Sequence, residues 1–248
     1  NAPKVEKQII SFKNGLAELP QLLVAALGEA VHANVSISSI QKIRAGWRVD
    51  WNGKTHIYDE VLLTTPAHAL TKLPLDESLQ KALQPLLKIN YSPVSVLTLA
   101  FKQSDVDHPL DGFGVLVPEY EGRKILGVLF PASLFASRVP AGEVLLTVFL
   151  GGERQAELAV PDKDTLLATV LPELKELFGT TGEPTFSHHR HWPRAIPQYN
   201  LGYGKMLAQM DAIEKKFAGL KLAGNYRDGI SLSYCIEAAV SKEGHLIA

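Results

Sequence analysis

The segment from Lys221 to Leu232 has the residue types and spacing that could bind an anion. An apolar strand pattern leads into a loop bracketed by Gly224 and Gly229, and a helical pattern begins near Leu232. Backbone N–H groups at a helix start attract negative charge because the helix dipole is positive there. Glycine would let the backbone approach a phosphate or a flat ring closely. An ordinary strand-to-helix connection has the same pattern, so both interpretations stay open.

A histidine cluster and a single cysteine are the other candidates for chemistry. His188, His189 and His191 surround Arg190. In a strand, His189 and His191 would share a face, but no nearby acidic residue completes a metal site. We therefore expect a solvated or partly packed strand and no metal. Cys235 falls on the apolar side of the last predicted helix, which indicates a buried structural thiol rather than a nucleophile. We identify no catalytic residue.

The segment from Trp192 to Tyr199 combines two prolines with a Trp, a Tyr and an Arg. Its prolines make it too rigid for a helix interior, and its aromatic content is high for a solvated loop. One interpretation places a ring of this segment against a cofactor. The other is a buried crossover with ordinary aromatic packing.

Apolar periodicity predicts the elements that position these residues, and the fold class is α+β. Helices are predicted over 18–27, 76–87, 162–178, 204–217 and 232–241, and Pro172 should kink or split the third. A three-stranded antiparallel meander is predicted over 36–58. The unbroken apolar strand Val61–Leu63 should be buried on both faces. Strands over 91–102, 113–117, 124–130 and 143–151 indicate one antiparallel sheet, and further strands are predicted over 184–191 and 219–223.

Composition excludes several classes of protein. The chain has 248 residues, with 25 Lys and Arg against 26 Asp and Glu, so it lacks the positive charge of a nucleic-acid-binding protein. The hydrophobic share of 46% and the charged share of 21% are those of a globular protein rather than a disordered one. Without an apolar run of membrane-spanning length or a signal-peptide pattern, we expect no transmembrane span and a cytoplasmic location.

Six blocks of the sequence, in order and at compatible spacing, carry a family resemblance. They are Ser11–Leu16 with Leu19-Pro20, Asp111–Pro118, Leu126–Phe130, Phe149–Gly152, Trp192–Tyr199, and Gly224–Gly229 with Cys235–Glu237. In these blocks the chain resembles the bacterial, oxygen-dependent protoporphyrinogen oxidases of the FAD-dependent amine oxidase superfamily. The chain departs from the family's pattern at Gly202-Tyr203, at Ala238-Ala239 and at Pro172.

The resemblance implies the C-terminal half of such an enzyme. Residues 1–70 and 216–248 would complete a split FAD-binding domain whose glycine motif is missing here, and residues 71–215 would form the substrate domain. The backbone at Ile37, just before the core of the second meander strand, would meet the adenine end of FAD. Trp192 would lie near the flavin, and Arg194 is the nearest candidate to bind a substrate carboxylate. The remaining cofactor-binding positions implied by the family are Gly224, Asn225, Gly229, Ile230, Ser231 and Leu232.

The implied activity is the stepwise six-electron oxidation of a porphyrinogen in haem biosynthesis, with FAD as cofactor and dioxygen as electron acceptor. This chain alone is expected to be inactive and to associate, for example as a homodimer, through surfaces that the missing half would cover. The full-length protein is expected to be cytoplasmic or peripheral at the membrane. Two alternatives stay open: a stand-alone module that binds a tetrapyrrole or a partner, and an FAD amine oxidase or desaturase with another substrate.

Overall fold

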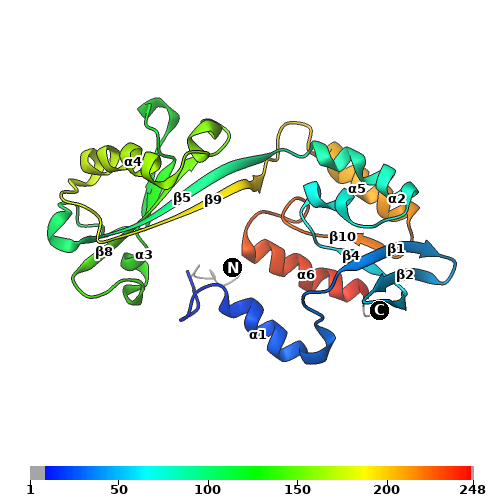
Figure 1. Cartoon of the computed structure of the whole chain (residues 1–248). Helices are drawn as coiled ribbons and strands as arrows, with labels where there is room; N and C mark the ends of the chain where they lie inside the picture. The colour runs from blue at the N-terminus through cyan, green and yellow to red at the C-terminus, as the bar shows by residue number, and fades with distance from the viewer. Residues whose placement is uncertain (1–8, 247–248) are drawn as a thin grey trace, which may run out of the picture.

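Two lobes are joined by a pair of long antiparallel strands, β5 (Tyr91–Lys102) and β9 (Phe186–Pro197), in the computed structural model (Figure 1). The structure describes the backbone of residues 9–246 and the side chains of residues 9–241. The predicted strand over 184–191 thus extends through most of the aromatic Trp192–Tyr199 segment. The register shift between Ser92 and Val94 accommodates extra residues of β9 at Pro193.

The first lobe is a five-stranded antiparallel sheet covered on one face by a helix. The strand order is β6-β7-β8-β5-β9, where β6 is Gly114–Leu116, β7 is Gly127–Leu129 and β8 is Glu143–Gly151. α4 (Lys163–Phe178) buries four apolar side chains at helical spacing against this sheet, Leu166, Val170, Leu174 and Phe178. The short helix α3 (Pro131–Leu134) contacts β8. The prediction of a single antiparallel sheet is confirmed, with β9 as an additional edge strand.

Pro172 lies inside α4 without splitting it. A proline removes one backbone hydrogen bond and leaves the carbonyl four residues earlier without its partner. Pro172 and Ala168 are both exposed on the outer face of the helix, where water can satisfy that carbonyl. Of the two expected outcomes, a kink or a split, the split does not occur, and the buried face of the helix continues to Phe178.

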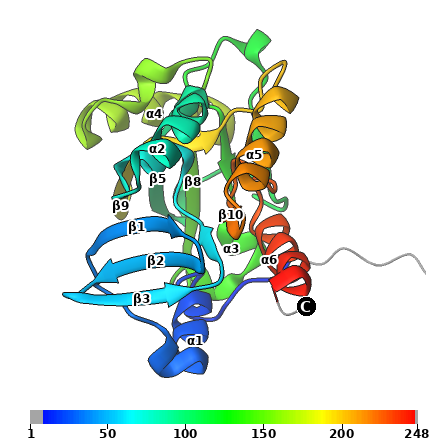
Figure 2. The ribbon, with the colours of Figure 1, turned by 90° about the vertical axis from the view of Figure 1, so that its right-hand side faces the viewer.

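The second lobe combines a meander, a parallel strand pair and helices. The meander is β1 (Ile37–Ile43), β2 (Gly46–Trp51) and β3 (Lys54–Tyr58), as predicted. β4 (Val61–Leu63) pairs in parallel with β10 (Leu220–Leu222). Figure 2 shows this pair between the meander and the helices α5 (Gly204–Lys216) and α6 (Leu232–Leu246). α2 (Glu77–Leu83) and the 3-10 helices η2 (Ala67–Lys72) and η3 (Gln84–Lys88) join the same core.

Burial of Val61–Leu63 differs from the prediction. Leu63 is buried, but the side chain of Leu62 is 39% exposed. Within the described residues the parallel sheet has two strands, and one of its faces lacks the helices that cover parallel sheets. The expectation of burial on both faces is wrong for the chain as it stands.

Two hydrophobic cores correspond to the two lobes. One core draws its residues from 40–89 and 210–226, and the other from 97–178. α1 (Glu18–Leu27), at the predicted position, buries none of its side chains. The functional division at residues 70/71 and 215/216 stays a prediction, although α2 and α5 pack with the meander.

Candidate functional site

The loop between β10 and α6 is held in an open turn by its own backbone. The N–H groups of Arg227 and Asp228 donate to the carbonyl oxygen of Gly224 at 2.9 and 3.0 Å, and the Asp228 carboxylate accepts from the N–H of Gly224. Gly224 has φ +136° and Gly229 has φ +114°, which other residues rarely adopt. A Cβ on Gly229 would lie 2.8 Å from the Cβ of Tyr234, so glycine is required there.

Two tyrosines from the segment between β9 and α5 hold the loop in place through hydrogen bonds. The hydroxyls of Tyr199 and Tyr203 donate to the carbonyl oxygens of Asn225 and Tyr226. Burial raises the pKa of both phenols, so they remain protonated donors at neutral pH. Sequence reasoning missed this role for Tyr203, which it treated only as a departure from the family's pattern.

An ion-pair network anchors the other side of the loop. Arg227 contacts Asp211 at 2.8 Å and Glu214 at 3.1 Å, both on α5. Glu214 also accepts the N–H of Leu222 at the end of β10. The loop is therefore fixed to a strand and a helix, and its outer edge is free to face a ligand.

The outer edge of the loop presents backbone donors that have no partner among the described residues. The backbone N–H groups of Ile230 and Ser231 make no hydrogen bond within the described part of the chain. No acidic residue occupies the first turn of α6, and the carboxylate of Asp228 in the loop is turned to the N–H of Gly224. The side chains of Ile230 and Leu232 are 44% and 50% exposed. The structure therefore brings together Gly224, Asn225, Gly229, Ile230, Ser231 and Leu232 around a helix start that offers free N–H donors.

Ile37 lies elsewhere in the second lobe. It is the first residue of β1 and pairs with Trp51, so its predicted place before the core of the second strand is wrong. The register of the β1–β2 pair shifts between Ile37 and Ser39. Its role toward a cofactor stays a prediction.

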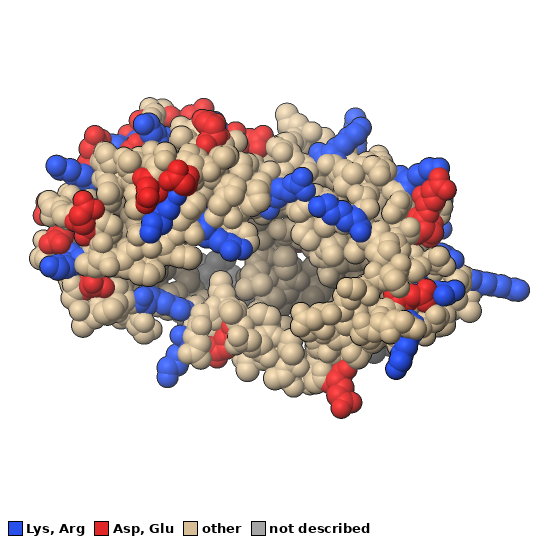
Figure 3. All heavy atoms as spheres, viewed as in Figure 1, with Lys and Arg blue, Asp and Glu red and all other residues tan. Residues whose placement is uncertain are grey.

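An apolar pocket of about 440 Å³ lies on the sheet face opposite α4. Alternating residues of four strands place their side chains on this face. The pocket is lined by Val94, Val96, Leu116, Leu126, Phe149 and Trp192. Its size is that of a small-molecule site, and its walls are almost wholly hydrocarbon and aromatic. Figure 3 shows a hollow between the two lobes.

Sequence reasoning found only Trp192 among the pocket residues. Leu116, Leu126 and Phe149 belong to the blocks that carry the family resemblance, and the sequence assigns them no role. The signal was present, because strand alternation assigns each of them to one sheet face. Neither composition nor periodicity says which face is open.

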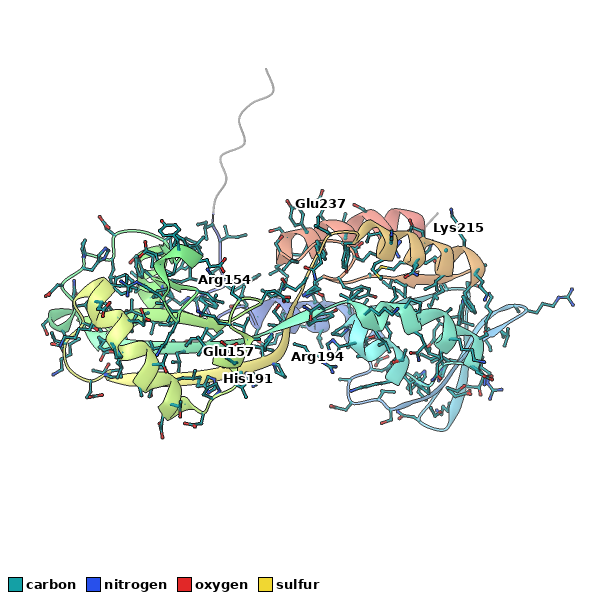
Figure 4. The ribbon with its side chains drawn as sticks, turned by 90° about the horizontal axis from the view of Figure 1, so that it is seen from above. Arg154, Glu157, His191, Arg194, Lys215 and Glu237 are labelled. Atoms are coloured by element: carbon teal, nitrogen blue, oxygen red, sulfur yellow. The ribbon has the colours of Figure 1, made fainter. Side chains whose placement is uncertain are left out.

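Arg190 stacks on Trp192, one of the pocket residues. Its guanidinium carbon lies 4.5 Å from the ring centroid of Trp192, and this stacking orients the charge along the open sheet face. Arg194 does not line the apolar pocket. It lies with Lys72 and Lys88 in a separate groove at the junction of the lobes, where Figure 4 labels it.

His189 and His191 share a face, as predicted, and both contact the buried Ser95. The hydroxyl of Ser95 donates to the carbonyl oxygen of Ala159 at 2.6 Å. A hydroxyl has one proton, so His189 Nε2 at 2.9 Å and His191 Nδ1 at 3.3 Å must donate to it. Burial, with the charges of His191 and His188, lowers the pKa of His189. His189 and His191 thus pack around Ser95 as a structural network on the face of the sheet that carries α4.

Other candidates from the sequence have structural places. Cys235 is half-buried, and its thiol donates to the carbonyl oxygen of Gly229 at 3.4 Å, so it supports the loop. Across the described residues, no three His, Cys, Asp or Glu side chains are grouped to bind a metal ion. None of the helices in the described part is both long and apolar enough to cross a bilayer.

Comparison with known proteins gives consistent matches over nearly the whole chain. Residues 3–242 match the family described as flavin containing amine oxidoreductase. Over 185 residues the chain is 37% identical to the mitochondrial protoporphyrinogen oxidase of Nicotiana tabacum, which covers 73% of the chain and 37% of that protein. It is 33% identical over 241 residues to protoporphyrinogen oxidase 2 of Arabidopsis thaliana, covering 91% of the chain and 47% of the relative.

A solved structure from Exiguobacterium sp. 255-15 has the same fold. It superposes with a TM-score of 0.78 at 22% identity, over 95% of this chain and 51% of that one. The chain therefore spans about half or less of the length of these relatives.

Proposed function

Because the chain belongs to the flavin containing amine oxidoreductase family, we propose that it supplies the substrate pocket and part of the cofactor site of an FAD-dependent porphyrinogen oxidase. The observation that carries the proposal is the apolar pocket on the open face of the five-stranded sheet. A porphyrinogen is a large, largely apolar macrocycle. It needs flat apolar walls and few polar groups at its rim.

The pocket walls would hold the macrocycle and exclude water. Leu116 and Leu126 approach from the β6–β7 side and Trp192 from β9, so a flat ring would lie between aliphatic and indole surfaces. Phe149 lies between them on β8. Water exclusion strengthens the interactions of a reacting C–H or N–H group with its surroundings.

FAD is the proposed cofactor, and the loop Gly224–Leu232 is its proposed contact in this chain. When bound, the flavin supplies two-electron oxidation, with dioxygen as the proposed acceptor. The N–H groups of Ile230 and Ser231 would bind its negatively charged part, and Gly224 and Gly229 would allow close approach. The tyrosine pair Tyr199 and Tyr203 would keep these donors in place.

A split cofactor domain is the second element of the proposal. Residues 1–70 and 216–248 would complete an FAD-binding domain, and residues 71–215 would bind substrate. Two observations support it: the parallel sheet has only two strands, and neither α1 nor the described part of α6 has a buried side chain. Added parallel strands and helices would cover these surfaces.

Porphyrin binding to the chain tests the pocket. Mesoporphyrin added to the purified chain should quench Trp fluorescence, because Trp192 forms a pocket wall. The variant Leu116→Asp should weaken binding at least about tenfold, since it places a charge against an apolar ring. Leu116 is 89% exposed, so this change leaves the core intact.

The matched control is Phe186→Asp, on the same strand as Trp192 but outside the pocket and 53% exposed. Equal affinities of wild type, L116D and F186D would show that the porphyrin does not use the pocket. Binding of an amine substrate with no binding of porphyrin would favour the amine oxidase alternative.

Flavin retention tests the split domain. The chain incubated with FAD and then desalted should keep no flavin absorbance and produce no peroxide with porphyrinogen. A stoichiometric flavin band with peroxide formation would show that these residues alone form a working site.

A further inference from the structure

A second cavity, of about 500 Å³, lies where η2 and η3 meet the ends of β5 and β9. Three cations from three separate segments line it: Lys72 on η2, Lys88 on η3 and Arg194 on β9. No Asp or Glu is among its lining residues. We call this cavity the cationic groove.

The three charges have no carboxylate partner in the part of the chain that the structure describes. Other arginines in the molecule do have such partners. Arg123, in a groove beside α4, contacts Glu173 at 2.9 Å and Glu176 at 3.0 Å. Glu153, near the cationic groove, accepts hydrogen bonds from Asn90 and Ser92 and does not line it. Unpaired like charges in one cavity repel each other, and an anion between them relieves that repulsion.

His68 supplies an independent sign of an incomplete site. Its ring lines the groove, and its Nδ1 atom is buried without a hydrogen-bond partner among the described residues. The ring packs edge-on against Tyr91, with centroids 4.9 Å apart. Burial lowers the pKa of His68, and the charges of Arg194 and Lys72 lower it further, so the imidazole is neutral at pH 7.

The groove is a near neighbour of the apolar pocket along the same two strands. Tyr91 lines the groove and Val94 lines the pocket, and three residues of a strand span about 10 Å. On β9 the change is sharper, because Arg194 lines the groove and Ala195 lines the pocket. Adjacent strand residues ordinarily face opposite sides, but the register shift between Ser92 and Val94 interrupts that alternation here. A ring in the pocket would reach the cations through a flexible acidic side chain that crosses this shift.

We propose that the cationic groove is an oxyanion-binding site, formed by Lys72, Lys88 and Arg194 around His68. This inference rests on the proposed function, and the ligand of the groove is a carboxylate side chain of the porphyrinogen that the apolar pocket holds. A free small oxyanion such as phosphate has the same chemistry, and the experiment separates the two sources.

The first arm compares coproporphyrin III with its tetramethyl ester, which keeps the ring and lacks the charges. The full chain is titrated by Trp quenching in one detergent buffer at several salt concentrations. The triple variant Lys72→Gln, Lys88→Gln, Arg194→Gln should bind the acid about tenfold more weakly, with a shallower salt dependence, because charge-assisted contacts are lost. Ester binding should be unchanged. Lys102→Gln, at the far end of β5 and outside the groove, is the matched charge control.

The second arm uses inorganic phosphate and the NMR titration of His68. An anion beside Lys72 and Arg194 offsets their charges, so phosphate should raise the pKa of His68 in the wild type and not in the triple variant. A merely structural role of the three cations would leave this phosphate effect absent.

The outcomes separate the two proposals. Weaker acid binding with unchanged ester binding supports the groove with a ring carboxylate as ligand. A phosphate effect on His68 with unchanged acid binding supports it with a free anion as ligand. If the triple variant matches the wild type in both arms, the groove proposal is wrong, whereas ester binding still reports on the pocket. Failure of the ester to bind counts against the proposed function alone.

Discussion

α4 and α6 have similar lengths, 16 and 15 residues, and opposite relations to the core. α4 buries four apolar side chains against the five-stranded sheet. α6 exposes its apolar residues, among them Ile236 at 48% and Val240 at 65%, and so does α1. An apolar helical stripe is stable only when something covers it. The sheet lobe therefore contains its own cover, whereas the lobe with α1 and α6 presents surfaces that suit a partner.

The largest expected effect comes from opening the sheet core. Phe101 is fully buried on β5, and Phe101→Ala should lower the free energy of unfolding by about 3–5 kcal/mol. Phe186→Ala, on the same sheet but 53% exposed, is the control and should cost far less. Urea unfolding followed by circular dichroism measures both.

The same experiment shows whether the lobes unfold separately. If they do, F101A shifts one transition and leaves the other in place. A single transition that moves as a whole would mean that the long β5–β9 pair couples the unfolding of the two lobes. The lobes would then differ in their exposed surfaces and not in their stability.

The next effect in size concerns one helix cap in each lobe. Asp76 accepts the N–H of Leu79 at the start of α2, and Asp162 accepts those of Asp164 and Thr165 at the start of α4. Asp76→Ala should cost about 1 kcal/mol of stability. Asp162→Ala should act in the same direction in the other lobe. Thermal melts of each variant would assign every transition to its lobe.

These caps also give a pH dependence. Burial opposes ionisation of Asp76, but hydrogen bonds from Ser78 and Leu79 outweigh it and lower its pKa. Hydrogen bonds from Thr165 lower the pKa of Asp162. A lowered pKa in the folded state adds stability above the usual Asp range near pH 4, and that stability is lost as the pH falls below it. Asp76→Asn keeps the cap and should reduce this acid dependence; an unchanged dependence would exclude Asp76 as its source.

The predictability of the two lobes differs for a physical reason. Alternation and turn glycines were sufficient for β5, β8 and the meander, because strands of those lengths have local signals. The apolar pattern of Val61–Leu63 wrongly predicted burial on both faces. Such a pattern indicates that a strand suits a buried position, but it does not show whether the covering elements are part of the chain. Pro172 is tolerated in α4 because it lies on the exposed face of the helix, and a sequence pattern does not show which positions are exposed.

The candidate site shows the same limit. The glycine loop at 224–229 was found from local sequence, because φ requirements and helix starts are local. Leu116, Leu126 and Phe149 were not assigned to a pocket, since pockets form between strands distant in sequence. Lys72, Lys88 and Arg194 meet for the same reason, and no spacing rule connects them.

The smallest expected effect on stability, and the sharpest test of the comparison, lies on α1. Leu23 is 54% exposed, so Leu23→Ser should change the free energy of unfolding by less than about 0.5 kcal/mol. Its counterpart in α4 is Leu166, 1% exposed, where the same replacement should be strongly destabilising.

We expect the wild-type chain to associate, as a dimer or larger, and L23S to weaken that association in light scattering. A wild-type chain that stays monomeric at high concentration would show that the exposed stripe does not bind a second copy. The apolar surface of α1 would then suit a different partner, such as a segment equivalent to the part of the relatives that this chain does not span.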